Sequence, residues 1–254
     1  MAATAPFAFL FGMIAGSFAS VLAHRVPRGE PWVAGRSHCT SCGETIAAYD
    51  NIPVLSWLVL RGRCRSCRAR IPARYPLTEL AMAALFAATV IVLGTDDAGE
   101  LALGLSFCAV LVVVTLTDLE QRIIPNTVLA GGAIVGLVLV AATDASSLPD
   151  RAIAAFGAGG FLLAFALAYP RGMGMGDVKL AAVMGLYLGR AVIPALMVAV
   201  LAGALVGLVL MARDGAAARK RAVPFGPFLA LGGVVGLLAG DQILDWYLDT
   251  FAGG

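Results

Sequence analysis

The sequence predicts an all-α polytopic membrane protein, with about eight transmembrane helices and a small cytoplasmic domain between the first and the second. Three observations predict this class. Hydrophobic residues make up 60% of the 254 residues and charged residues 13%, and the mean hydropathy is +0.89. Apolar stretches recur along the chain, and about 20 apolar residues suffice to cross roughly 30 Å of hydrocarbon. A single long interval, 24–76, is polar.

The apolar stretches give approximate limits for the spans. No basic residue precedes the first stretch, so we interpret it as a retained helix and not as a signal peptide. The sixth is short, and only Arg190 marks its boundary with the seventh. The eight predicted spans are 5–23, 78–94, 101–117, 127–143, 152–169, 178–190, 191–211 and 225–247.

The distribution of basic residues predicts the orientation in the membrane. Lys and Arg in short loops stay on the cytoplasmic side. With the N-terminus outside, 16 of the 18 basic residues fall in cytoplasmic segments, and only Arg151 and Arg190 lie outside. The net charge of +2 conceals this asymmetry and gives no indication of nucleic-acid binding.

The same pattern divides the chain into three expected parts. Residues 1–23 form the first transmembrane helix, and residues 24–76 form a cytoplasmic domain that holds nine Arg and four of the five Cys. Residues 77–254 consist of helical hairpins with short connections and form an intramembrane domain. The lipid bilayer is therefore an expected partner of most of the chain.

The cysteine pattern of the polar domain indicates a structural zinc site. Two C-x2-C pairs are separated by 21 residues, slightly more than the roughly 15 to 20 usual for such sites. Four thiolates can close a tetrahedral site that holds a domain with little apolar core. Two disulfides, a redox pair and a contribution from His38 are alternatives; a reducing cytoplasm disfavours the first. The predicted ligands are Cys39, Cys42, Cys64 and Cys67.

Two aspartates at the ends of predicted spans are the candidate catalytic residues. Asp118 closes the third span and Asp177 opens the sixth, and by the charge topology both lie at the cytoplasmic face. Carboxylates at such positions are costly and therefore suggest a function. Two that approach each other can share a proton. Such a pair hydrolyses a peptide bond without a metal, as one member accepts a proton from water and the other polarises the carbonyl.

Neighbouring residues support the pair or compete with it. Gly174 and Gly176, with Gly172 before them, free the backbone ahead of Asp177 to bend beside an extended peptide. Glu120 is the main rival of Asp118. Taken singly, each aspartate is also compatible with an interfacial carboxylate that reaches headgroup water. A proton-coupled transporter is the alternative function, because intramembrane carboxylates also carry protons.

Several motifs together resemble the type IV prepilin peptidases. These are Gly174-Met-Gly-Asp177, Thr117-Asp118 with Ile-Pro-Asn126 downstream, and the paired cysteine motifs with the intervening stretch 51–57. The stretches 70–79 and 16–25 also match, so the resemblance covers nearly the whole chain. Glu120 and Asn126 depart from the pattern, since many members have Asp at both positions.

The resemblance implies a bacterial inner-membrane enzyme with two activities. It implies cleavage of the basic leader of prepilins and pseudopilins at the cytoplasmic face by Asp118 and Asp177. It also implies N-methylation of the new N-terminus with S-adenosylmethionine, in which the 24–76 domain takes part. Glu79 is a candidate member of the methyl-donor site, and Glu79 and Glu120 are candidates for binding the basic leader. A non-enzymatic zinc-containing assembly factor is a further alternative.

Overall fold

The computed structural model describes residues 4–33, 35–169, 173–215 and 223–251, and every regular element in these ranges is a helix. The only extended pairings among them are two isolated bridges in the polar domain. The predicted all-α class is therefore confirmed. Contacts divide the chain into unit 1, Met1–Gly94, and unit 2, Thr95–Gly254.

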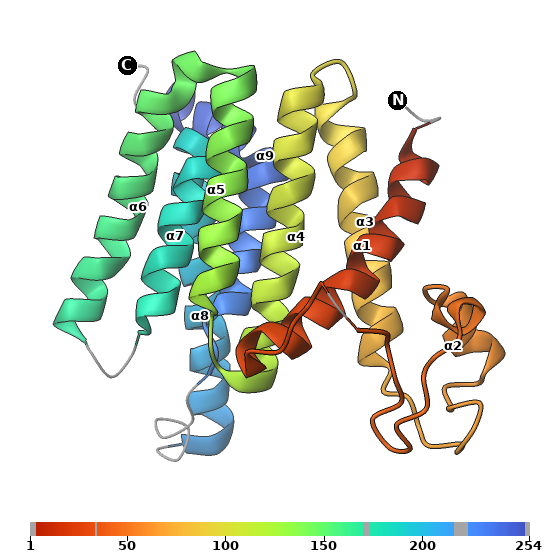
Figure 1. The fold of residues 1–254 in the computed structure, drawn as a ribbon. Coiled ribbons are helices and arrows are strands. Elements are labelled where there is room, and N and C mark those ends of the chain that lie inside the picture. Colours follow the sequence, from red (N-terminus) through yellow and green to blue (C-terminus); the bar gives the residue numbers. More distant parts are fainter. Residues whose placement is uncertain (1–3, 34, 170–172, 216–222, 252–254) are drawn as a thin grey trace. The chain divides into compact units, whose positions relative to one another are not determined.

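Unit 1 is built on two long helices, α1 (Ala5–Arg25) and α3 (Arg74–Leu93), which pack along each other (Figure 1). Glycines make this packing close. A Cβ on Gly12 would lie 2.6 Å from the Cα of Ala83, and a Cβ on Gly16 would lie 2.7 Å from the Cα of Glu79. Small residues allow such backbone approach where apolar side chains gain little by leaving lipid.

The polar domain of unit 1 lies between these helices in the sequence. It contains the short turns η1 (Val26–Arg28) and η2 (Ala48–Asn51) and one short helix, α2 (Leu55–Val59). Val54 precedes α2 with φ of 60°, a conformation that a β-branched residue rarely adopts. Two hydrogen bonds fix this region. The Val54 N–H donates to Oε2 of Glu79 (2.7 Å), and the Trp57 indole N–H donates to the carbonyl of Ile71 (3.1 Å).

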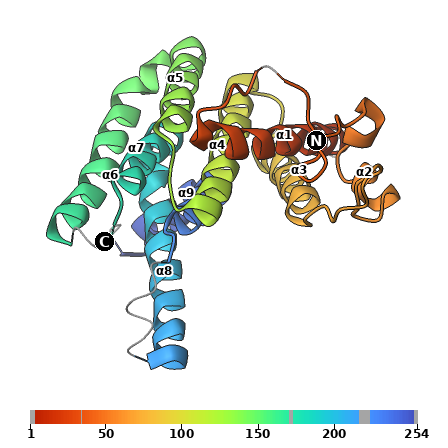
Figure 2. The same ribbon diagram turned by 60° about the horizontal axis from the view of Figure 1, so that its bottom comes forward.

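Unit 2 is a helical bundle. Helix α6 packs along α7, α8 packs along α9, and α4 contacts both α5 and α9. Figure 2 shows α9 between α4 and α8. The fully buried core contains Phe107, Leu180, Met184 and Leu229. The helices are α4 (Ala98–Gln121), α5 (Asn126–Thr143), α6 (Leu148–Ala168), α7 (Met175–Leu188), α8 (Val192–Asp214) and α9 (Gly226–Phe251), with the short turns η3 (Ala145–Ser147) and η4 (Gly189–Ala191).

Seven helical stretches among the described residues are long and apolar enough to cross a membrane. The longest, Met175–Arg213, contains two helices, α7 and α8, which η4 separates. Gly189 has φ of 55° at this break, and the end of α7 and the start of α8 both contact α9 around Gly236. The sixth and seventh predicted spans are thus separate helices, and the boundary that the sequence placed at Arg190 lies in η4.

Candidate active site and metal centre

Asp118 lies in the last turn of α4, and its side chain is only 6% exposed. The Gly226 N–H, at the start of α9, donates to Oδ2 of Asp118 over 2.8 Å. A Cβ at position 226 would lie 2.7 Å from the same oxygen, so only glycine leaves room for this contact. The Asp118 carboxylate is therefore held in place by a residue 108 positions away in the sequence.

Asp177 lies in the first turn of α7 and is 8% exposed. The N–H of Gly174, which precedes the helix, donates to Oδ2 of Asp177 over 3.1 Å. This bond fixes the carboxylate at the helix start, as in a capping box. A backbone donor holds the carboxylate without bringing a compensating positive charge.

The two carboxylates lie in the same unit, at the end where α4 finishes and α7 begins (Figure 1). Helices α4 and α7 are in contact. Each carboxylate has its Oδ2 held by a glycine N–H. The structure thus brings together the two aspartates that the sequence singled out, in a form that suits acid–base chemistry.

The glycines before Asp177 act differently from the expectation. Gly174 has φ of −83° and ψ of 149°, an extended conformation that any residue can adopt. Its contribution is the N–H that it donates to Asp177. Gly176 provides space instead, because a Cβ there would lie 2.9 Å from the Cβ of Ile124. Gly172 lies outside the described residues.

Two charged neighbours of the pair are arranged in ways that sequence spacing did not reveal. Glu120, the rival of Asp118, is exposed, whereas Asp118 is buried. The Lys179 ammonium donates to Oδ1 of Asn126 over 2.9 Å and so joins α7 to the start of α5. The pairing of Lys179 with Asn126, 53 positions away, was missed, although Asn126 belongs to a motif that the sequence had marked.

The four predicted metal ligands form one cluster in unit 1. Their sulfur atoms all lie within 4.8 Å of one another, and Sγ of Cys39 lies 3.8 Å from Sγ of Cys67. A tetrahedral site with Zn–S bonds of about 2.3 Å places its sulfurs about 3.8 Å apart. All four cysteines are free thiols, so the disulfide alternative does not describe this structure. The cluster is compatible with a metal site of four sulfur ligands.

The electrostatics of the thiols also suit a cation. The backbone N–H of Ser41 lowers the pKa of Cys39 to about 6, which favours its thiolate. A hydrogen bond from the Glu44 backbone acts to lower the pKa of Cys42. The side-chain hydrogen bond to Cys67 and the charge of Cys39 outweigh it, so the pKa of Cys42 rises to about 12. A second thiolate beside the first is therefore unfavourable until a cation neutralises them.

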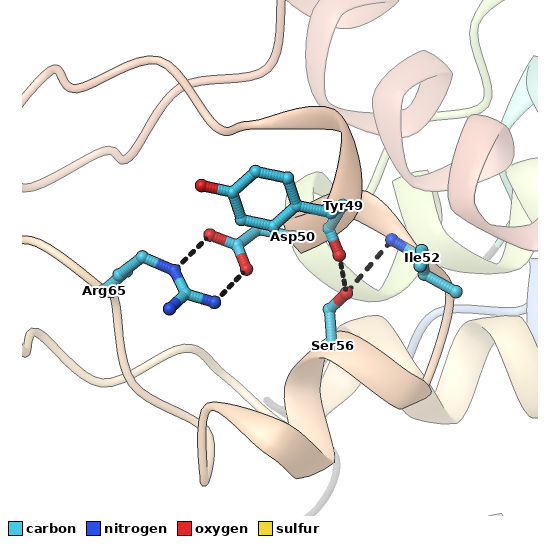
Figure 3. Close-up of polar contacts among 5 residues, drawn as sticks. All are labelled: Tyr49, Asp50, Ile52, Ser56 and Arg65. Carbon is cyan, nitrogen blue, oxygen red and sulfur yellow. Dashed lines mark hydrogen bonds and ion pairs between the residues drawn. The ribbon is translucent and has the colours of Figure 1, made fainter.

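An ion pair braces the second cysteine pair. Arg65, between Cys64 and Cys67, donates from Nε and Nη2 to the two carboxylate oxygens of Asp50, over 2.7 and 2.6 Å (Figure 3). Its guanidinium also lies 5.5 Å from the ring centre of Tyr49. The hydrogen bonds from Arg65 lower the pKa of Asp50 below its ordinary value. Sequence analysis missed this contact, because no spacing rule relates residues 15 positions apart in an irregular loop.

Ser56 completes this corner of the polar domain. Its hydroxyl donates to the carbonyl of Tyr49 over 3.0 Å and accepts the Ile52 N–H over 3.1 Å (Figure 3). Glu79, from α3, is buried and accepts the Val54 N–H. The turn before α2 is therefore held by one residue of α2 and one of α3. The Glu79 carboxylate thus accepts a hydrogen bond from a backbone amide of its own unit.

Comparison with known proteins gives matches along most of the chain. The profile described as the bacterial peptidase A24 N-terminal domain matches residues 10–93, and that of the type IV leader peptidase family matches residues 105–211. The comparison with solved structures found no match.

Curated relatives match over nearly their whole length. A protein of Aeromonas hydrophila is 36% identical and one of Bacillus subtilis (strain 168) is also 36% identical; each alignment covers 96% of this chain, and 93% and 98% of the respective relative. A protein of Burkholderia pseudomallei (strain 1026b) is 35% identical over 92% of this chain and 85% of its own length. All three carry the name prepilin leader peptidase/N-methyltransferase. With its paired aspartates and its cysteine cluster, this multi-pass membrane chain belongs to the type IV leader peptidase family.

Proposed function

We propose that this chain removes the leader peptide from type IV prepilins and related pseudopilins and then N-methylates the new N-terminus. The observation that carries the peptidase activity is the pair of buried aspartates at one end of unit 2, each held by a glycine N–H. The names of its relatives support both reactions and none of the three refers to transport.

The catalytic residues of the proposal are Asp118 and Asp177. One carboxylate is ionised and accepts a proton from a water molecule. The oxygen of that water molecule attacks the scissile carbonyl carbon. The other, protonated, donates a hydrogen bond to the carbonyl oxygen. Collapse of the tetrahedral intermediate breaks the C–N bond, and the leaving amine takes up a proton from the pair. The N–H groups of Gly174 and Gly226 hold both carboxylates in position for these transfers.

The proposed orientation places this pair at the cytoplasmic face of the bacterial inner membrane. The charge asymmetry supports it, because 16 of the 18 basic residues then lie inside. A prepilin has a basic leader that stays in the cytoplasm and an apolar helix that follows in the bilayer. Its scissile bond therefore lies at the interface, where a pair at the ends of α4 and α7 can reach it.

The cysteine cluster is proposed to hold a structural Zn²⁺. Four sulfurs within 4.8 Å of one another, and thiols that resist double ionisation without a cation, support this assignment. When bound, zinc would supply folding free energy to a polar domain that has little apolar core. In this proposal, residues 24–76 form the methylation region and residues 77–254 form the peptidase.

S-adenosylmethionine is the proposed methyl donor, by similarity to the named relatives. It would supply the methyl group that the new amino terminus receives. Glu120, which is exposed near the end of α4, is the proposed contact of the basic leader, and the Glu79 carboxylate is buried and accepts the Val54 amide.

Co-expression with a prepilin tests the function. Intact-mass spectrometry of the pilin should show loss of the leader and the added mass of one methyl group, with this chain present and not with an empty vector. A Glu120→Lys variant should cut more slowly if that residue binds the basic leader, and unchanged cleavage removes that role. Full-length precursor in the presence of the wild-type chain contradicts the proposed function.

A further inference from the structure

Helix α2 exposes a cluster of large apolar side chains outside the long helices. Leu58 is 58% exposed and Val59 is 67% exposed, and Ile52 and Leu55 beside them are also exposed. We call these four residues the α2 face. The other side of the helix packs inward, because Ser56 is buried and Trp57 donates to Ile71. A contiguous exposed apolar surface of this kind marks a contact with something else.

The position of α2 along α3 indicates its depth relative to the candidate membrane span. Val54, directly before α2, is hydrogen-bonded to Glu79, and Figure 1 shows α2 beside α3. Glu79 is the sixth residue of the apolar stretch Arg74–Leu93. At 1.5 Å per residue, it lies about 8 Å beyond the start of that stretch. The α2 face is therefore level with the first turns of a candidate membrane span, at a depth where interfacial helices insert by about 5 to 10 Å.

The charges next to the α2 face fit an anionic lipid surface. Arg61 and Arg63 follow α2 directly and are exposed. The interval 24–76 holds nine Arg against the three acidic residues Glu30, Glu44 and Asp50, a difference of 9 − 3 = +6. An anionic leaflet attracts each Arg that lies close to its surface. A basic leader peptide would be repelled by the same surface.

We propose that the α2 face is a membrane contact of the polar domain. Ile52, Leu55, Leu58 and Val59 enter the boundary between headgroups and acyl chains of the leaflet where α3 begins. Arg61 and Arg63 lie among anionic phospholipid headgroups. The polar domain is thus held against the bilayer at a third point, besides its covalent links to α1 and α3. This inference goes beyond the proposed reactions and does not depend on them.

A tryptophan reporter tests the contact in the full chain. Leu58→Trp is introduced after Trp32 and Trp246 have been replaced by Phe, and the parent that retains Trp57 gives the background. The matched control is Thr45→Trp, at an exposed position of the polar domain outside α2. The chains are placed in nanodiscs that contain phosphatidylglycerol. Wild-type resistance of the polar domain to proteolysis shows that each variant folds.

The expected result is that lipids brominated near the top of the acyl chain remove most of the emission added by Leu58→Trp, whereas acrylamide in the water does not. The Thr45→Trp emission should show the reverse. Quenching of Leu58→Trp by acrylamide would place the α2 face in water and overturn the proposal. Protection from both quenchers would mean that protein covers it, either unit 2 or another copy, and would also overturn it.

The charge part of the proposal has its own measurement. Replacing phosphatidylglycerol by a zwitterionic lipid, or introducing Arg61→Glu with Arg63→Glu, should lower the bromolipid quenching of Leu58→Trp. The two changes made together should lower it no further than either alone. Quenching that is independent of lipid charge would overturn the assignment of Arg61 and Arg63 to anionic headgroups.

Discussion

Gly226 is the residue whose effect on catalysis the structure predicts most sharply outside the aspartates. In Gly226→Ala the new Cβ would lie 2.7 Å from Oδ2 of Asp118, so the carboxylate must move and lose its N–H donor. Misplacement of a catalytic group by about 1 Å can cost about 10²-fold in rate. We expect leader cleavage to fall by about that factor, as measured with a purified prepilin.

Gly131→Ala is the matched control for that variant. Gly131 also lies in a long helix of unit 2, but a Cβ there would meet nothing within 4 Å. Cleavage by Gly131→Ala should equal that of the wild type. Equal losses in both variants would mean that the Gly226 effect comes from general changes in the helices and not from Asp118.

Asp50 predicts a pH dependence of the stability of the polar domain. Its bond to Arg65 lowers its pKa below the ordinary 3.8, so the ion pair stabilises the folded domain at pH values above that figure. The stabilisation is lost as the pH falls through the lowered pKa. Asp50→Asn lacks it at every pH. The thermal midpoint is followed by Trp57 fluorescence, with Trp32 and Trp246 replaced by Phe in both chains. The difference in midpoint between the chains with Asp50 and with Asp50→Asn should be full near neutral pH and shrink in strong acid; a difference that grows in acid contradicts this assignment.

At the scale of the helices, Tyr187 ties three elements together. Its hydroxyl, from α7, donates to the carbonyl of Gly132 in α5 over 2.7 Å, and its ring stacks on Phe107 of α4 with centroids 4.9 Å apart. Tyr187→Phe keeps the ring and should lower the unfolding free energy by about 1 kcal/mol. Tyr187→Ala should lower it by about 3 to 5 kcal/mol. Equal effects of the two substitutions, measured by denaturant titration in detergent, would mean that the ring contributes nothing.

The positions of the long helices could be predicted from the sequence, whereas their ends and their pairing could not. Apolar stretches predicted the long helices, because crossing hydrocarbon imposes length and hydropathy on each span. Their ends were missed by several residues, as at Arg74, since polar residues continue a helix beyond the bilayer. The pairing of α9 with α4 through Gly226 and Asp118 was not predictable, because hydropathy says nothing about which helices touch.

In the candidate sites, the residue types could be predicted from the sequence, but the contacts between distant residues could not. Asp118, Asp177 and the four cysteines were found because their types and positions are costly or rare without a function. Val54 with Glu79, and Asp50 with Arg65, escaped prediction because each depends on a turn that only the folded chain defines.

For the whole molecule, the separation into two units predicts that the two reactions respond differently to loss of the metal. The cysteine cluster lies in unit 1, and both aspartates lie in unit 2. Cys64→Ser, or treatment with a strong zinc chelator, should reduce methylation of the mature pilin much more than leader removal. Metal content per chain is measured on the same samples. Methylation that survives complete metal loss contradicts the structural role proposed for zinc.

The most direct test of the whole account is leader cleavage by purified Asp118→Asn and Asp177→Asn, each in nanodiscs with a prepilin, beside wild type and Glu120→Gln. Asparagine keeps the size of the side chain but can neither take up nor release the proton. We expect both Asn variants to leave the precursor at full length, while Glu120→Gln still removes the leader. Cleavage by either aspartate variant at the wild-type rate would contradict the aspartate pair as the catalytic centre.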